Sequence, residues 1–231
     1  MGGNRPTSRK RRPTASFNRF ILTSFAKTIG VKNLLPFFSY VFHPIFIPVI
    51  GTLLYFRLGE NYWVTEQIFL VLIQVSIIMV FIPMCFFYLL RTMGKADSVM
   101  LSDVTQRKMP LAIQIVLTAL LIANSITIDL IPELYYFFLG GLISSGLALA
   151  FAFLKIKISL HQLGVAALFA LAVGLSMHSQ IQALYLIALC ALTNGIVAAS
   201  RLEMGAHTAR ELVLGGLCGL LPQIGLWYFW L

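Results

Sequence analysis

The chain has 231 residues, of which 59% are hydrophobic and only 11% are charged, and its mean hydropathy is +0.88. Because soluble globular domains carry about a quarter of charged residues, this composition excludes a soluble protein and predicts a multi-pass membrane protein. The net charge of +9 can lie only in a tail, in short loops or at intramembrane sites, which argues against nucleic-acid binding. Long unbroken apolar runs exclude a transmembrane β-barrel, whose strands alternate in polarity.

Residues 1–36 carry eight of the 17 basic residues and no acidic residue. This composition predicts a basic, disordered N-terminal arm. The basic stretch is too long for a secretory signal and no small-residue cleavage site follows it, so we expect the arm to be retained. A basic segment beside a membrane is attracted to anionic lipids.

Residues 37–231 are predicted to form one integral membrane domain. Seven apolar segments follow one another, most of them near the ~20 residues that a helix needs to cross the hydrocarbon core. The segments are 37–56, 67–90, 110–130, 135–154, 163–179, 181–199 and 213–231. Helices are the expected spanning form because each satisfies its own backbone hydrogen bonds away from water. The predicted fold class is therefore an all-α, polytopic transmembrane helical bundle with six to seven spans.

Basic residues are distributed unequally between the two ends of this bundle. If all seven segments cross, the arm and the loops 91–109, 155–162 and 200–212 lie at one end and carry 16 of the 17 basic residues. The positive-inside rule then places this end and the N-terminus in the cytoplasm, and we expect the membrane to be a bacterial inner membrane. If the proline-containing segment 37–56 does not cross, six spans remain and the same end faces outward.

Three polar clusters interrupt the apolar pattern, at residues 103–110, 157–162 and 200–211. Two crossings separate each cluster from the next, so we expect all three to meet at the same end of the bundle. Together they contain two histidines and several Arg and Lys residues. Because phosphoryl transfer depends on positioning and on positive charge around the transferred group, this set is sufficient without a metal or another cofactor.

The third cluster contains the strongest candidate for a nucleophile. His207 and Glu211 are four residues apart at the start of an apolar segment, so on a helix they share one face. The carboxylate can accept a hydrogen bond from one ring nitrogen while the other nitrogen faces a substrate. Arg201, in the preceding turn, can present a planar donor fork to a phosphate. The simpler interpretation of the His207/Glu211 pair is a solvated contact at a helix start.

The other two clusters offer a proton donor and further phosphate ligands. His161 is the candidate donor, and Ser159 and Lys157 are candidate ligands. Ser159 is also suited to cap the following helix, and Lys157 to anchor the chain at the membrane interface. Arg107 and Lys108 supply cations in the first cluster, whose simpler interpretation is a solvated loop.

The third cluster resembles a motif of the type 2 phosphatidic acid phosphatase superfamily, membrane enzymes that dephosphorylate lipid phosphates and diphosphates without metal. The motif is SRxxxxxHxxxD. Ser200, Arg201 and His207 match it in identity and spacing, and Glu211 takes the place of Asp.

The other two motifs of that superfamily are only partly present. The second, PSGH, corresponds to residues 158–161, where Ser and His keep their places while Ile and Leu replace Pro and Gly. The first, KxxxxxxRP, is absent, and the basic residues before Pro110 retain only its charge. The loss of Gly at position 160 removes the residue best suited to bring backbone amides against a phosphate. Members of the superfamily also commonly have six spans, and bacterial members often act at the external face.

The resemblance implies a role for each candidate residue. His207 would be the nucleophile that becomes phosphohistidine, Glu211 its orienting acid, and His161 the general acid. The implied phosphate ligands are Arg201, Ser159, Lys157, Arg107, Lys108 and Ser200.

These features predict a membrane phosphohydrolase acting on a lipid phosphate or a polyprenyl diphosphate. The alternative is a catalytically degenerate relative that binds anionic lipids or acts as a membrane scaffold, which the altered motifs favour. A small-solute transporter is disfavoured because it would be expected to have paired discontinuous helices and charged residues near the middle of the segments, and the sequence indicates neither.

Other residues within the segments are interpreted as structural. His43, which precedes a proline, is taken as structural, and Asn194 is expected to hydrogen-bond between helices. Gly215, Gly216 and Gly219 are expected to permit close helix approach. The three cysteines lie at irregular spacing and are interpreted as packing residues.

Overall fold

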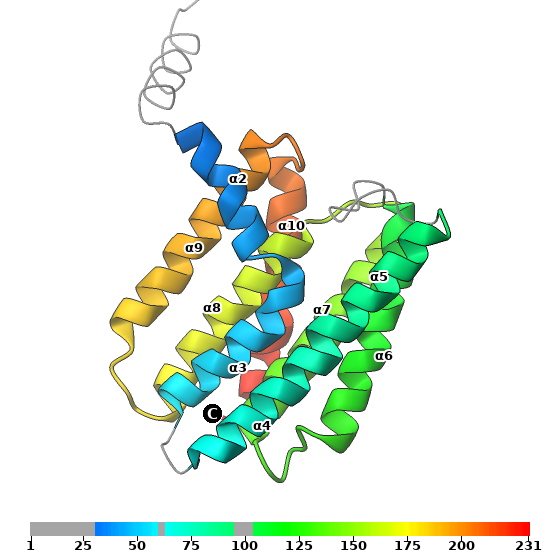
Figure 1. Ribbon diagram of the computed structural model, residues 1–231. Helices are drawn as coiled ribbons and strands as arrows, with labels where there is room; N and C mark the ends of the chain where they lie inside the picture. The colour runs from blue at the N-terminus through cyan, green and yellow to red at the C-terminus, as the bar shows by residue number, and fades with distance from the viewer. Residues whose placement is uncertain (1–30, 60–62, 95–103) are drawn as a thin grey trace, which may run out of the picture.

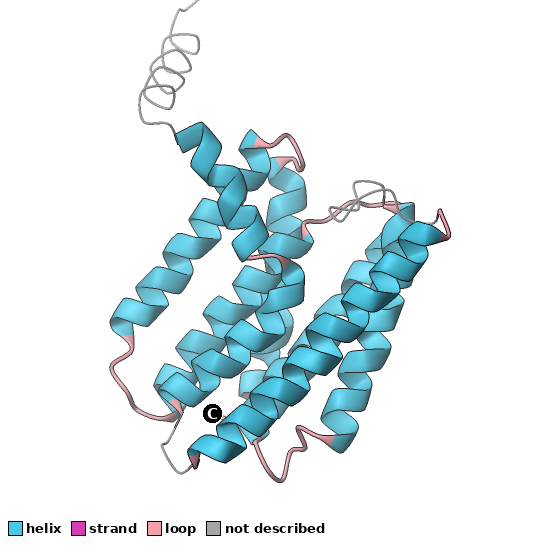
Figure 2. Cartoon of the chain, in the orientation of Figure 1, coloured by secondary structure: helices cyan, strands magenta, loops and turns pink. Residues whose placement is uncertain are grey.

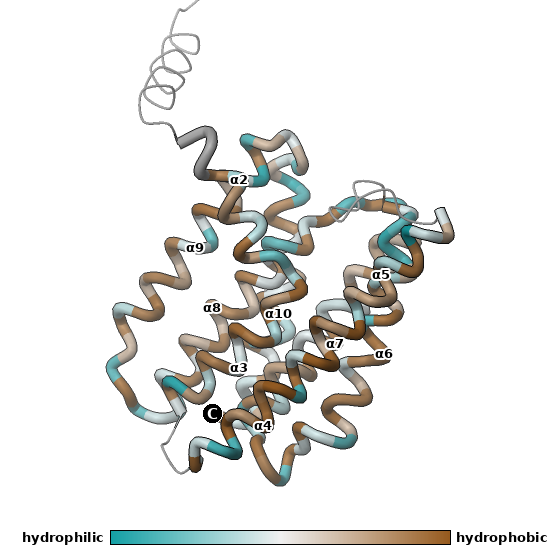
Figure 3. Tube along the Cα trace, in the orientation of Figure 1, coloured by the Kyte–Doolittle hydropathy of each residue, from teal (hydrophilic) through white to brown (hydrophobic). Residues whose placement is uncertain are grey.

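The computed structural model describes residues 31–59, 63–94 and 104–231, and the regular elements within these ranges are all helices (Figure 2). The predicted all-α fold is confirmed. Six segments within these ranges are long and apolar enough to cross a membrane, and hydrophobic residues dominate the helices while hydrophilic residues gather near their ends (Figure 3). The chain is therefore a multi-pass membrane protein.

The helices follow the seven predicted apolar segments in order (Figure 1). Two of these segments are divided into shorter elements. The elements are α2 (Val31–Val41), η1 (Pro44–Phe46), α3 (Ile47–Leu58), α4 (Thr65–Ser76), η2 (Ile77–Phe81), α5 (Ile82–Thr92), η3 (Thr105–Arg107), α6 (Lys108–Asn124), α7 (Pro132–Phe153), α8 (Leu160–His178), α9 (Leu184–Glu203) and α10 (Ala209–Trp227).

The described part of the chain begins with a helix inside the predicted arm. Helix α2 begins at Val31, within the segment that the sequence analysis assigned to the arm. The rest of the predicted arm, residues 1–30, lies outside the described residues.

The first apolar segment is broken between α2 and α3. Residues before a proline are biased toward extended backbone, and His43, which precedes Pro44, has φ −63° and ψ 138°. The N–H of Ile45 donates to Nδ1 of His43 at 3.3 Å, which caps the short helix η1. The helix then resumes as α3 at Ile47.

Helix α8 is the centre of the bundle. In the most apolar stretch of 18 residues in α8, 61% is buried inside the protein. In the corresponding stretches of the other five candidate spans, 17–33% is buried. Helices α3, α7, α9 and α10 all pack on it. Leu168, Leu171 and Leu175 of α8 form the core together with Leu134 and Phe137 of α7.

Helix α10 is the seventh segment and differs from the six candidate spans. Its hydropathy is lowered by the polar residues Arg210, Glu211 and Gln223 and by several glycines. It nevertheless packs along both α8 and α7, and Trp230, just beyond its end, belongs to the core. The predicted range of six to seven spans is confirmed.

Helices α8 and α10 approach each other closely along their first turns. A Cβ atom at Gly215 would meet the carbonyl oxygen of Ser159, and one at Gly219 would meet that of Leu163. From the first contact to the second, the residue number rises by four on both helices. The two helices therefore run in the same direction. The N–H of Ser159 also donates to the carbonyl of Glu211 at 3.0 Å. As predicted, the small residues permit close packing.

A polar contact joins α8 to α9 within the bundle. The side-chain amide of Asn194 donates to the carbonyl of Val165 at 3.0 Å, and its oxygen accepts from Gln162 at 3.1 Å. The predicted hydrogen bond between helices is confirmed.

The starts of α2, α6, α8 and α10 and the end of α9 lie at one end of the bundle (Figure 1). The described parts of the three polar clusters therefore meet at the same end, as the alternation of crossings predicted.

Gly219→Ala should destabilise the protein, because its methyl group would collide with the backbone of α8. We expect the free energy of unfolding to fall by about 1–3 kcal/mol, the usual cost of overpacking. Thermal unfolding in detergent measures the change.

Gly216→Ala is the matched control, since a Cβ there meets its nearest atom, in the flexible Gln162 side chain, only at 3.6 Å. This variant should be neutral or slightly stabilised because Ala is the better helix former. Equal unfolding midpoints for the two variants would contradict the packing argument.

Candidate functional site

A cavity of about 380 Å³ lies within the bundle and reaches its polar end. Five of its lining residues carry imidazole or guanidinium groups, namely His43, Arg107, His161, Arg201 and His207. Apolar side chains of η1, α5, α7 and α8 line most of the remainder. The cavity is therefore amphipathic, with basic groups at one end and mostly apolar side chains over the rest.

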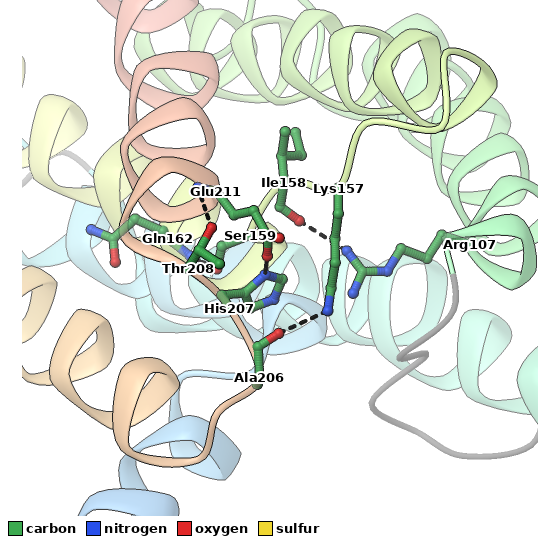
Figure 4. A network of polar contacts seen from close by, with 9 residues as sticks. All are labelled: Arg107, Lys157, Ile158, Ser159, Gln162, Ala206, His207, Thr208 and Glu211. Atoms are coloured by element: carbon green, nitrogen blue, oxygen red, sulfur yellow. Dashed lines mark hydrogen bonds and ion pairs between the residues drawn. The ribbon is translucent and has the colours of Figure 1, made fainter.

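His207 lies in the connection before α10, with its side chain only 2% exposed. It stands two residues before the helix, whose N-cap is Thr208, so the expectation that it lies on the helix is wrong. Its Nδ1 is nevertheless 2.7 Å from Oε2 of Glu211 (Figure 4). The neutral ring donates from Nδ1 to the carboxylate, which leaves the unprotonated lone pair on Nε2.

Burial lowers the pKa of His207 from 6.5 to about 4. The hydrogen bond to Glu211 raises this pKa, while the charges of Arg107, Arg201 and Lys157 lower it further. His207 is therefore neutral at physiological pH. Because the unfolded chain binds the proton more readily, this residue's contribution to stability is complete above pH 6.5 and is lost as the pH falls toward 4.

Two cations beside His207 are held by backbone carbonyls. Nη1 of Arg107 donates to the carbonyl of Ile158 at 2.8 Å, and Nζ of Lys157 donates to that of Ala206 at 2.8 Å (Figure 4). Arg107 lines the cavity, whereas Lys157 does not. These bonds join the start of α6, the α7–α8 connection and the α9–α10 connection.

Arg201 lies in the last turn of α9 and is 2% exposed. The expectation that it lies in a turn between helices is wrong, because α9 continues to Glu203. One of its guanidinium nitrogens contacts the sulfur of Met204 at 3.9 Å. Charged groups buried at membrane depth are costly and commonly functional, which makes Arg201 the strongest candidate phosphate ligand.

Ser200 anchors α2 and does not line the cavity. Its hydroxyl donates to the carbonyl of Leu35 at 2.6 Å, so it accepts from the hydroxyl of Ser39, 2.6 Å away. These bonds fix the first described helix against α9.

His161 lies in the first turn of α8 and is 5% exposed. Its Nε2 is 3.1 Å from the carbonyl oxygen of Ser39, to which it donates. In the neutral ring Nδ1 is then the unprotonated atom. His161 lines the cavity, but in this conformation its Nε2 proton is directed to the backbone of α2 and not to a leaving group.

Ser159 and Lys108 also face away from the cavity. The hydroxyl of Ser159 accepts from the N–H of Gln162 at 3.3 Å, so Ser159 is the N-cap of α8, the structural alternative given by the sequence. Nζ of Lys108 lies 4.7 Å from the centroid of the Phe153 ring, a cation–π contact. Asp103, at the start of the first polar cluster, lies outside the described residues.

His43 is a cavity residue that the sequence analysis treated as structural. Its ring lies 5.2 Å from that of His161, at an interplanar angle of 85°. The available signal was an ionisable residue within an apolar segment, which is a functional candidate by default. The sequence analysis did not follow this signal, because the expected helix break before Pro44 was a sufficient structural explanation for His43.

No protein-family model, no curated protein and no solved structure matches this chain. The resemblance to the type 2 phosphatidic acid phosphatase superfamily therefore rests on the residues at 158–161 and 200–211.

Glu211→Gln should lower the pKa of His207 below its value of about 4, because the hydrogen bond to the carboxylate raises that pKa. Titration of the imidazole chemical shifts in detergent measures the change. Glu133→Gln, at the other end of the bundle beside His178, should leave His207 unaffected. A His207 that titrates near 6.5 in the unmodified chain would contradict its burial.

Proposed function

We propose that the chain is a membrane phosphohydrolase that removes phosphate from a lipid phosphate or a polyprenyl diphosphate. The amphipathic cavity is the observation that carries this proposal. His207, Arg201 and Arg107 lie at its basic end, and apolar side chains line most of the rest. An amphiphile with an anionic head and a hydrocarbon tail matches both linings.

The reaction proceeds through His207. Its Nε2 attacks the phosphorus atom, the bond between phosphorus and the leaving oxygen breaks, and the leaving group departs with the electron pair and takes up a proton from water. Glu211 stabilises the positive charge that develops on the imidazole. Arg201 and Arg107 stabilise the negative charge on the phosphoryl oxygens. Water then attacks the phosphohistidine, releases phosphate and restores the free ring.

The hydrocarbon tail passes between η1 and α5. Phe46 of η1 and Met84 of α5 both line the cavity and are 40% and 37% exposed. On this proposal the cavity opens between these two residues to the lipid. A substrate can keep its tail in the bilayer while its headgroup contacts the basic end.

We further propose that the basic end of the cavity faces the cytoplasm and that the membrane is a bacterial inner membrane. The support is the excess of Lys and Arg in the loops that precede α6, α8 and α10, together with the positive-inside rule. On this assignment the N-terminus is cytoplasmic and phosphate is released into the cytoplasm.

Binding of anionic lipid without turnover is the second candidate function. It is favoured by the hydrogen bond from His161 to the backbone of Ser39 and by the use of Ser159 as a helix cap. Both residues are then engaged in structure and not in catalysis.

His207→Ala should reduce phosphate release from phosphatidic acid to background, because the nucleophile is lost. Arg201→Ala should reduce it by about 10²–10³-fold, the usual effect of losing one stabilising donor. His161→Ala should also lower the rate, since this ring lines the site. The assay uses purified protein in detergent with a chelator present.

His178→Ala is the matched histidine control, because His178 lies at the opposite end of α8 and should retain full activity. Substrate bound without phosphate release in the unmodified chain would favour the binding function. Release that persists in all three site variants would place the reaction elsewhere.

Gly141→Phe should shorten the tail-binding part of the cavity. Gly141 lines the cavity, and a Cβ there meets no atom within 4 Å. Hydrolysis of a long-chain lipid phosphate should fall several-fold more than hydrolysis of a short-chain one. Gly146→Phe on the same helix also has open space but lies outside the cavity, and it should not discriminate between the chains. Equal chain-length profiles for both variants would contradict the tail assignment.

A further inference from the structure

Gln114 lies inside the candidate span formed by η3 and α6, where a polar side chain is costly unless it is paired. Two other amides within the bundle, those of Asn194 and Gln223, each donate to a backbone carbonyl, at 3.0 and 2.9 Å. The Nε2 of Gln114 instead contacts the sulfur of Met79 at 3.8 Å. Because a thioether is a weak acceptor, helix packing leaves this amide only weakly bonded.

The side chains of Gln114 and Ser145 both line the cavity, one from α6 and the other from α7. Among the described residues, the hydroxyl of Ser145 forms no hydrogen bond. Thr118, the next cavity residue of α6, differs because its hydroxyl donates to the carbonyl of Gln114 at 2.7 Å. Gln114 and Ser145 therefore bring hydrogen-bonding capacity to a wall that is mostly apolar.

The depth of this pair follows from the contact between Lys108 and the ring of Phe153, which places these two residues at the same height. Helix α6 runs away from the basic end and α7 runs toward it (Figure 1). Gln114 is six residues after Lys108, and Ser145 is eight before Phe153. With a helical rise of about 1.5 Å per residue, they lie about 9 and 12 Å below that height, whereas Gly141 lies about 18 Å below it. The pair thus stands between the cations and the tail-binding part of the cavity.

This order of linings matches one class of lipid phosphate better than the other. In an acyl ester of glycerol phosphate, ester carbonyls lie between the phosphate and the hydrocarbon tails. In a polyprenyl diphosphate the hydrocarbon follows the phosphate directly, which would leave the amide and the hydroxyl against hydrocarbon. An ester carbonyl is a stronger acceptor than a thioether, and the flexible side chain of Met79 can move to admit it.

We propose that Gln114 and Ser145 form an ester-binding subsite, in which the amide and the hydroxyl donate hydrogen bonds to the acyl carbonyls of a glycerol-based lipid phosphate. This inference rests on the proposed function, because a phosphate held at the basic end fixes the depth at which the carbonyls lie. The two residues determine specificity and take no part in the chemical step.

Two substrates that differ in the carbonyls alone test the subsite, namely dioctanoyl phosphatidic acid and its dioctyl ether analogue. Phosphate release and calorimetric affinity are measured for both lipids on the full chain in detergent, with geranylgeranyl diphosphate for comparison. The variants are Gln114→Leu and Ser145→Ala. Asn124→Leu is the matched control, because Asn124 is a polar residue of the same helix that donates to the carbonyl of Leu120 at 2.9 Å and lies outside the cavity lining.

We expect the unmodified chain to prefer the ester to the ether by about three- to tenfold in kcat/KM and in affinity, the effect of about one net hydrogen bond. Gln114→Leu should reduce this ratio to about one by weakening only the ester, and Ser145→Ala should reduce it in part. Asn124→Leu should keep the full ratio. Since each variant is compared with itself, partial unfolding lowers both values and does not change the ratio.

The outcomes separate the subsite from the enzyme. Equal turnover of the two lipids by the unmodified chain would overturn the subsite and leave the phosphohydrolase intact. A preference that survives in both Gln114→Leu and Ser145→Ala would overturn the assignment to these residues, and faster hydrolysis of geranylgeranyl diphosphate would overturn the lipid class. Ester-selective binding that is lost in Gln114→Leu, without phosphate release from any substrate, would support the subsite and refute only the enzyme.

Discussion

The close contact between α8 and α10 is the constraint on which the site depends. At Gly215 and Gly219 the two helices touch through backbone atoms, and the N–H of Ser159 reaches the carbonyl of Glu211. The first turn of α8 and the start of α10 are therefore held side by side. Because His161 belongs to the former and His207 immediately precedes the latter, the packing of small residues places both imidazoles on one cavity. Bulky residues at these positions would separate the histidines.

Burying cations among helices is costly unless each donor finds an acceptor. Here the acceptors of Arg107 and Lys157 are the carbonyls of Ile158 and Ala206, both in connections between helices. These bonds offset part of the cost of burying the two cations. Burial, and then the charges of Arg107, Arg201 and Lys157, lowers the pKa of His207 and keeps its ring neutral.

The helices and their shared end were predictable because apolar runs of about 20 residues have one stable form in a membrane. The individual roles of polar side chains were less predictable. For Ser159 the sequence offered a structural alternative, and its hydroxyl does cap α8. For Ser200 it offered none, and the hydroxyl of Ser200 joins α2 to α9. The pairing of His207 with Glu211 was predicted from helical spacing, yet it forms with His207 outside the helix. His43 was missed because contacts between distant segments are not visible in local sequence.

Pro44 links the break in the first segment to the orientation of His161. Proline has no N–H, so the carbonyl of Tyr40 loses its usual helical donor four residues later. The N–H of His43 bonds this carbonyl at 3.3 Å and so leaves the carbonyl of Ser39, which it would otherwise have served. That carbonyl accepts from Nε2 of His161 at 3.1 Å. One proline thereby exposes a backbone acceptor, fixes the tautomer of a histidine on α8 and brings a second histidine to the same cavity. The unusual N-terminal segment is therefore part of the site and not only a membrane anchor.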